Sequence, residues 1–223
     1  MEELNPGAGE SILAIWNDCY VGDEDAYESW YQSKHLIECL RVPGFLRGRR
    51  FQRITGDSKY CTYYETESPE VLSTSDYLRL LNNPSSLTEQ IMCGTFLYMS
   101  RTVCRVVRRF GQIYVAFAVT AKLEDDVLVK AMCDYSETLL NQSCVARAEI
   151  WAVDMHCSRT KTREETLRGE DEQIKACLIV ETLRETSARE ISEKVCERLG
   201  SKPKSIGCYQ LLCDIQSKRN TVD

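Results

Sequence analysis

The sequence predicts an α+β fold made of two tandem repeats, each of β-α-β-β-α-β order, which is the ferredoxin-like arrangement. Two observations support this prediction. Apolar runs with strand character alternate with segments of helical periodicity along the chain. The same order of elements then occurs twice, over residues 11–109 and 110–217. We therefore expect two domains of similar size, joined directly at Arg109-Phe110-Gly111.

The first repeat contains four predicted strands, at residues 11–17, 45–55, 59–67 and 95–108. Its predicted helices cover residues 23–40, 68–81 and 86–92. Asp23 or Asp25 is a suitable N-cap for the first helix, and Pro43-Gly44 ends it. Gly56-Asp57-Ser58 separates the second and third strands, as expected for a hairpin.

The second repeat contains predicted strands at residues 112–122, 144–155, 174–183 and 205–215. Its predicted helices cover residues 124–140 and 187–199. A charged stretch at residues 158–172 lies between the second and third of these strands. A long polar connection of this kind is either a solvated loop or a lid over a site.

Each predicted sheet has one face that its own helices do not cover. An antiparallel sheet of this order carries its helices on one face only, so its other face must be covered by something else. Two such sheets from one chain can face each other. We therefore expect a barrel formed within one chain, with a cavity between its two sheets.

Composition narrows the classes of partner. The net charge is −6 and the pI is about 5.2, which disfavours nucleic acid and anionic membranes as partners. No apolar run approaches the roughly 18 residues that span a membrane. The twelve cysteines include no CxxC pair, and several lie within strand-like runs. They predict free thiols and a cytoplasmic location.

His35 is the first candidate for chemistry. It follows Trp30 and Tyr31 on the predicted first helix, and Tyr31 and Cys39 lie four residues on either side of it. A histidine can give and take a proton near neutral pH, so His35 is a candidate general acid and base. The alternative is a core histidine with a satisfied hydrogen bond. His156 ends a predicted strand, and we expect it to be exposed and structural.

Two arginines are candidate anchors for an anionic oxygen. Strand side chains alternate, so Arg49 and Arg50 point to opposite faces and one of them can enter the cavity. We select Arg50, with Arg101 on the last strand of the repeat as a second candidate. The alternative is pairing with Glu65 or Glu67 across the sheet.

Aromatic and amide side chains complete the predicted site. Tyr64 shares a strand face with Tyr60 and Thr62, and a tyrosine in a pocket gives aromatic contact with a polar tip. Asn17, at the end of the first strand, polarises a carbonyl or closes a turn. Trp30 is either a pocket wall or part of the core.

The first half resembles the dimeric α+β barrel superfamily, close to its EthD-like domains, over residues 12–107. The motifs that carry the resemblance follow the order of the chain. They are Trp30-Tyr31 with His35, Arg41-Val42-Pro43-Gly44-Phe45, Arg49-Arg50-Phe51, Tyr63-Tyr64-Glu65 and Ser68-Pro69-Glu70-Val71-Leu72, followed by Tyr77-Leu78 and Arg101-Thr102. The second half lacks the Trp/His motif and has Asp134-Tyr135-Ser136-Glu137 in its place. It resembles a degenerate repeat, so one site per chain is expected.

The resemblance implies a function class, because the superfamily includes isomerases, polyketide cyclases, decarboxylases and monooxygenases. We expect a lyase, isomerase or cyclase that acts on a small aromatic, polyketide or keto-acid compound without a cofactor or a metal. The expected catalytic residues are His35, Arg50 and Tyr64. The expected substrate-binding residues are Asn17, Trp30, Tyr31, Tyr77 and Arg101.

Two alternatives stay open. One is a non-catalytic module of the same fold that binds a small molecule, or that packs against a partner through a sheet edge. The other is a haem protein in the manner of some superfamily members, which would use His35 or His156. Pairing of two chains as a homodimer is compatible with either.

Overall fold

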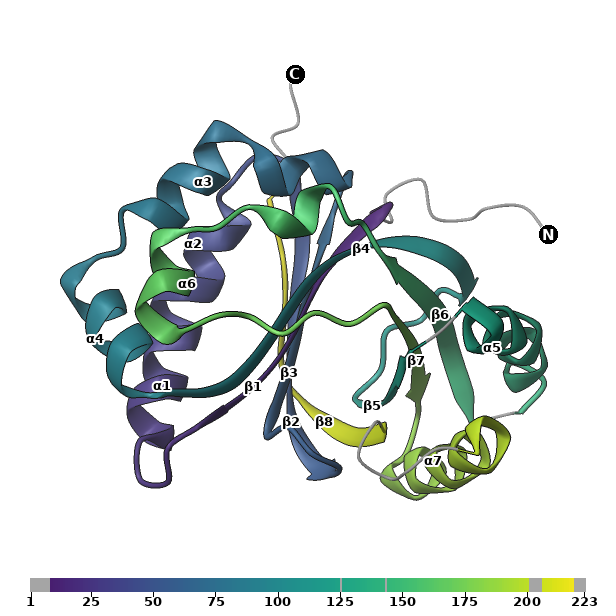
Figure 1. Ribbon diagram of the computed structural model, residues 1–223. Helices are drawn as coiled ribbons and strands as arrows, with labels where there is room; N and C mark the ends of the chain where they lie inside the picture. Colours follow the sequence, from purple (N-terminus) through teal and green to yellow (C-terminus); the bar gives the residue numbers. More distant parts are fainter. Residues whose placement is uncertain (1–8, 125, 143, 201–205, 219–223) are drawn as a thin grey trace.

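The computed structural model describes residues 9–124, 126–142, 144–200 and 206–218. These residues form one closed barrel with the strand order β1-β3-β2-β8-β5-β7-β6-β4, in which every pair of neighbours is antiparallel (Figure 1). The predicted α+β class and the barrel formed within one chain are confirmed. Each repeat contributes four consecutive strands to the barrel.

The strands of the first repeat are β1 (Ser11–Cys19), β2 (Phe45–Thr55), β3 (Tyr60–Thr66) and β4 (Phe96–Gly111). The strands of the second repeat are β5 (Phe117–Leu123), β6 (Val145–Val153), β7 (Ala176–Thr182) and β8 (Ile206–Gln216). The first residue predicted for the last strand, Ser205, lies outside the described residues. β4 continues past the predicted junction at 109/110, and the division into two domains stays a prediction.

The helical segments of the first repeat are α1 (Glu24–Trp30), a π-helical turn η1 (Tyr31–His35), α2 (Leu36–Leu40), a 3-10 turn η2 (Pro69–Ser73), α3 (Ser75–Asn82) and α4 (Ser86–Gly94). Those of the second repeat are α5 (Asp126–Leu139), a 3-10 turn η3 (Cys157–Arg159), α6 (Arg163–Arg168) and α7 (Glu185–Leu199). No helix of the described residues is long and apolar enough to cross a bilayer.

Two predicted elements are shorter than expected, for local reasons. The helix predicted at 68–81 is broken at Thr74, which is extended and whose Oγ1 accepts a hydrogen bond from the backbone N–H of Tyr77. The strand predicted at 112–122 begins only at Phe117. The segment before it is held by other bonds instead, since Val115 N–H donates to Glu181 and Tyr114 OH donates to Glu65.

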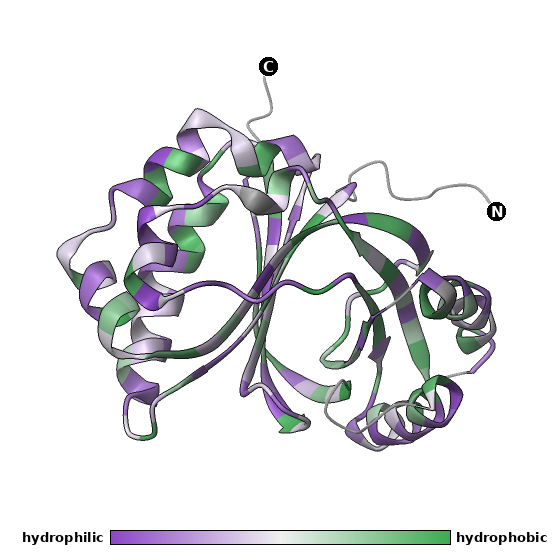
Figure 2. Cartoon of the chain, viewed as in Figure 1, coloured by the Kyte–Doolittle hydropathy of each residue, from purple (hydrophilic) through white to green (hydrophobic). Residues whose placement is uncertain are grey.

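Helices cover the outside of the barrel on two sides (Figure 1). α1 to α4, with α6, lie over the strands of the first repeat, and α5 and α7 lie over those of the second. Figure 2 shows hydrophilic and hydrophobic residues alternating along α5 and α7, as amphipathic helices require. The second interface is almost entirely aliphatic, with Leu178, Ile191 and Val195 at its centre.

The barrel interior is filled, which corrects the prediction of a cavity between the two sheets. Alternation sends Trp16, Phe51, Tyr63 and Trp151 inward, and these large rings pack together. Their neighbours on the outward face, such as Leu13 and Ile15, pack under the helices of the first repeat.

A buried ionic cluster shares the interior with these rings. Arg49 lies 2.6 Å from Glu181, and Arg147 lies 2.9 Å from Glu65 and 3.2 Å from Glu181. Arg147 also pairs with Glu149. Arg49 and Glu65 come from the first repeat and the others from the second, so the cluster joins the two repeats across the barrel.

Candidate functional site

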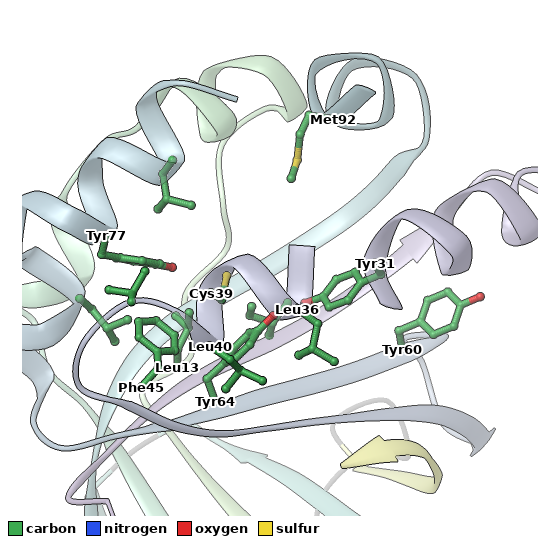
Figure 3. Close-up of a cluster of buried hydrophobic side chains, with 14 of the residues drawn as sticks. Leu13, Tyr31, Leu36, Cys39, Leu40, Phe45, Tyr60, Tyr64, Tyr77 and Met92 are labelled. Carbon is green, nitrogen blue, oxygen red and sulfur yellow. Dashed lines mark hydrogen bonds between the residues drawn. The ribbon is translucent and has the colours of Figure 1, made fainter. Parts of the chain in front are cut away.

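The candidate site is a narrow cavity between the helices of the first repeat and the outer face of its strands. Its volume is about 20 Å³, which is enough for one water molecule. Five of the predicted site residues line it, namely Tyr31, His35, Tyr64, Tyr77 and Arg101. Figure 3 shows Tyr31, Tyr64 and Tyr77, which come from three different elements. Met92 of α4 lies opposite Cys39 in the same view.

The π-helical turn η1 places two of these side chains. The backbone N–H of Leu36 bonds to the carbonyl of Tyr31, five residues earlier. The wider turn lets residues five apart meet, so the His35 ring stacks on Trp30 with centroids 4.7 Å apart and an interplanar angle of 24°. Tyr31 packs edge-on against His35 at 5.3 Å. Single π-turns inside helices occur frequently at functional sites.

His35 is buried and uncharged at neutral pH. Burial is the main cause that lowers its pKa, and the cationic Arg168 and Arg101 add to the effect, to give a value of about 3. Its Nε2 lies 3.9 Å from the Sγ of Cys39. The imidazole therefore presents a neutral hydrogen-bonding group to the cavity.

The stretch predicted as a polar loop at 158–172 contains α6, which packs against α3 and α4 and closes the cavity. Thr162 caps this helix, with its Oγ1 accepting from the backbone N–H of Glu165 at 3.3 Å. The backbone N–H of Arg163 donates to Asn82 at the end of α3. The Thr-x-x-Glu spacing is a helix-start signal that the sequence offered and that our prediction did not use.

α6 adds a carboxylate that sequence reasoning missed. The side chain of Glu164 lines the cavity and is only 3% exposed. Burial raises its pKa to about 7, although Arg168 and Arg101 act in the opposite direction. Arg168 is its nearest cation, at 3.9 Å, which is too long for a hydrogen bond. A carboxyl group in this state both gives and takes a proton near neutral pH.

The two arginines of the cavity differ in their partners. Arg168 bonds both carboxylate oxygens of Asp171, at 3.0 and 2.7 Å. Arg101 donates from Nη2 to the hydroxyl of Tyr77 at 3.1 Å, and none of the described residues forms an ion pair with it. The cavity wall thus contains a guanidinium whose charge has no direct counter-ion.

Arg50 does not line the cavity, although it points to the helix-covered face of β2. Its guanidinium lies among the rings of Tyr27, Tyr31 and Tyr60, at 5.1, 4.9 and 4.5 Å from their centroids. Its side chain is fully buried, and its three nitrogens have no hydrogen-bond partner within the described part of the chain. Arg49 faces the barrel interior, so the predicted separation of the two arginines is correct.

Asn17 and Trp30 also lie outside the cavity lining. Asn17 accepts a hydrogen bond from the hydroxyl of Tyr27 at 3.0 Å, and the indole N–H of Trp30 donates to Thr88 at 3.2 Å. Both are satisfied contacts of the core. His156 is exposed, as expected. The catalytic and binding roles assigned to all these residues from the sequence stay predictions.

A haem does not fit this cavity. The space at His35 holds about one water molecule, and the imidazole lies between Trp30 and Tyr31 with no room for a macrocycle beside it. His156, the other histidine of the chain, is exposed and lies outside the cavity lining.

Comparisons with known proteins show the fold. No family model matches the chain, and no curated protein matches it. Among solved structures, the chain is similar to an anthrone oxidase-like protein, with a TM-score of 0.61 and 9% identity over 94% of this chain and 93% of that one. It is also similar to a putative monooxygenase from Fusobacterium nucleatum (0.53, 12%, covering 95% and 99%) and to a putative chlorite dismutase (0.51, 12%, covering 91% and 94%).

Sequence identities this low support a shared fold but give no information about activity. The comparisons agree with the resemblance to the dimeric α+β barrel superfamily at the level of the fold. The finer assignment of the first half as an EthD-like domain stays a prediction.

Proposed function

We propose that this chain is an enzyme that moves a proton on a small organic molecule, as a lyase, isomerase or cyclase, in the cavity beneath α6. One observation carries the proposal. Glu164, whose pKa is near 7, lines the same cavity as the neutral His35 and as Arg101, which forms no ion pair with another described residue. Acid–base chemistry at neutral pH requires a proton carrier of this kind beside a group that stabilises negative charge.

The proposal assigns the proton to Glu164 rather than to His35. An imidazole with a pKa of about 3 is a weak base at neutral pH, so His35 serves as a neutral hydrogen-bonding partner. Burial raises the pKa of Tyr31 and Tyr64, and it raises that of Tyr77 to about 12. These hydroxyls stay protonated and orient the substrate.

The simplest balanced step begins with a C–H bond beside a carbonyl. The carboxylate of Glu164 takes the proton, the electron pair moves onto the carbonyl oxygen, and Arg101 stabilises the resulting enolate. Glu164 then returns the proton to the same or to another atom. The step consumes no redox equivalent and needs no cofactor.

Solvent deuterium exchange tests this function without a known substrate. Small 2-keto acids and phenolic ketones are incubated with the protein in D₂O, and loss of the C–H signal is followed by NMR. We expect exchange with the wild type and a loss of about 10² to 10⁴-fold in Glu164→Gln. Glu165→Gln, one position along α6, is the matched control and should retain exchange. Equal rates in the Glu164→Gln variant and the wild type would overturn the proposal.

A binding module without catalysis is the second candidate, and the narrowness of the cavity favours it. A compound that raises the melting temperature, undergoes no exchange and is recovered unchanged would support it. Docking through a sheet edge is not available in the described barrel, because each of its strands is paired on both sides. A homodimer and a cytoplasmic location stay predictions.

A further inference from the structure

The charges around the cavity do not balance when Glu164 is protonated. Arg168 is neutralised by the two bonds to Asp171, and Lys34 is neutralised by Glu38 at 2.8 Å. The side chains that remain are Arg101 and Glu164. With Glu164 ionised the local charge sums to zero, and with Glu164 protonated one positive charge is left.

The rest of the lining gives the cavity an apolar body. Leu13, Ile15, Leu81, Met92 and Phe96 contribute hydrocarbon and thioether surface next to the polar groups. A ligand that matches this wall has one charged end and an apolar remainder. A guanidinium binds a carboxylate through two parallel hydrogen bonds, and a monocarboxylate supplies the single negative charge that balances Arg101.

We propose that the cavity binds a small monocarboxylate through Arg101 and the Tyr77 hydroxyl, and that Glu164 takes up a proton when it binds. The proposal deepens the proposed function and rests on it for the location of the site. It adds the chemical class of the substrate and a coupling between binding and protonation. Only complexes in which Glu164 has released this proton can take the C–H proton of the proposed step, so the exchange rate should rise with pH while the affinity falls. In a 2-keto acid the carboxylate and the carbonyl oxygen are adjacent, so one guanidinium can contact both.

The coupling follows from the groups that face Glu164. Arg168 and Asp171 lie in the same segment as Glu164, Arg101 lies on β4 and Glu38 lies on α2. His35 of η1 is neutral and adds no charge. A bound carboxylate adds a negative charge beside Arg101, close to Glu164. Its field favours the protonated form of Glu164, so binding draws a proton from solution. Affinity should therefore fall about tenfold for each pH unit above the titration of Glu164.

The small volume of the cavity also limits the size of the ligand. A cavity of about 20 Å³ admits a carboxylate only when the surrounding side chains or α6 move outward. Formate, acetate and benzoate form a series of increasing size. Formamide, acetamide and benzamide are neutral controls of matched shape.

The experiment measures binding of these six compounds to the intact chain by calorimetry, between pH 5.5 and 8.5. Each titration is repeated in two buffers of different ionisation enthalpy, which reports the number of protons taken up. We expect at least one acid to bind at least tenfold more tightly than its amide, with proton uptake that increases toward one as the pH rises from 7 to 8.5. Arg101→Met should weaken that acid by tenfold or more. Arg105→Met, on the same face of β4 but half exposed and outside the cavity lining, should not.

The outcomes separate this inference from the proposed function. If the acids bind no better than the amides, or bind equally well to Arg101→Met, the substrate class is wrong, whatever deuterium exchange shows. If an acid binds without proton uptake, or if Glu164→Gln keeps the uptake, the coupling is wrong. If an acid binds with the expected coupling and no panel compound exchanges deuterium, the inference holds and the proposed catalysis fails.

Discussion

His35 and Glu164 face the same cavity, and burial moves their pKa values in opposite directions. The stability that His35 contributes is present above its ordinary pKa of 6.5 and is lost as the pH falls toward 3. The stability that Glu164 contributes is present below its ordinary pKa of 4.5 and is lost as the pH rises through 7. Between pH 4.5 and 6.5 the two effects on stability have opposite signs and partly cancel. Replacing one of the two residues therefore makes the pH dependence contributed by the other measurable.

Glu164→Gln should gain stability relative to the wild type as the pH rises from 4.5 to 7. The folded wild type keeps a proton that the unfolded chain releases, which changes the free energy of unfolding by about 1.4 kcal/mol per pH unit. Glutamine does not titrate and so lacks this slope. Urea unfolding at a series of pH values measures the difference, with Glu165→Gln as the control. A difference that stays constant with pH would show that Glu164 has an ordinary pKa.

His35→Gln should show the reverse. As the pH falls below 6.5, His35 of the unfolded wild type takes up a proton, whereas the buried ring of the folded protein stays neutral. The free energy of unfolding of the wild type therefore falls by about 1.4 kcal/mol per pH unit. The variant does not, so its stability relative to the wild type should rise toward pH 4. The control is His156→Gln, which replaces an exposed histidine outside the cavity lining. Parallel profiles for His35→Gln and the wild type would contradict the low pKa.

The sequence was informative about some site residues and not others. Tyr31, His35, Tyr64, Tyr77 and Arg101 share one repeat, and helical spacing and strand alternation are enough to bring them to one face. Glu164 and Arg168 lie in the other repeat, and only tertiary packing places them beside His35. Alternation correctly separated Arg49 from Arg50. The prediction that Arg50 enters a cavity between the sheets was wrong, because Arg50 points to the helix-covered face and Arg49 faces the interior.

At the level of the elements, most strands and helices were predictable because their periodicity is strong. The π-turn was not, because no composition signal distinguishes five residues of π-helix from α-helix. α6 was not predicted because its Arg- and Glu-rich sequence lacks an apolar stripe. Its position is set instead by the Thr162 cap and by contacts with α3 and α4.

The turn after α2 gives a testable case at this level. Gly44 has a φ of +91°, and a Cβ there would lie 2.5 Å from the Val71 side chain. Gly44→Ala should therefore destabilise the fold by about 1–3 kcal/mol, from backbone strain and the clash together. Gly94, in α4, is the control, because a Cβ there meets nothing within 4 Å.

Thermal and urea unfolding of the two variants measures the effect. Gly94→Ala should be neutral or slightly stabilising, since alanine favours helix. In Gly44→Ala/Val71→Ala the clash is removed and the strain remains, so only part of the loss should return. Equal stability of Gly44→Ala and the wild type would mean that the turn adopts a different backbone in solution.

For the whole molecule, the two repeats have diverged in what they bury. The first repeat packs polar and aromatic side chains under its helices and keeps a small cavity there. The second packs mainly aliphatic side chains under its helices, and its buried polar residues there include Ser136 and Ser187. That each chain has one site stays a prediction.

Two antiparallel ladders, β2 with β8 and β4 with β6, join these unequal halves, and the ionic cluster adds contacts between them in the barrel interior. From the sequence we predicted a barrel interior lined by both repeats. We did not predict that buried ion pairs would fill part of this interior. Arg147 and Glu181 are paired positions on β6 and β7, but Arg49 of β2 and Glu65 of β3 meet them only when the barrel closes, so periodicity within one repeat does not reveal these ion pairs.

Arg147→Met should destabilise the chain by about 3–5 kcal/mol, because it leaves the carboxylates of Glu65, Glu149 and Glu181 buried without their shared cation. The matched control is Arg105→Met, which removes exposed ion pairs with Glu70 and Asp154 and should change stability far less. Urea unfolding followed by tryptophan fluorescence reports on both, since Trp151 donates to Glu149 inside the cluster. If Arg147→Met costs no more than Arg105→Met, the barrel interior admits enough water to solvate the three carboxylates, and the cluster does not hold the repeats together.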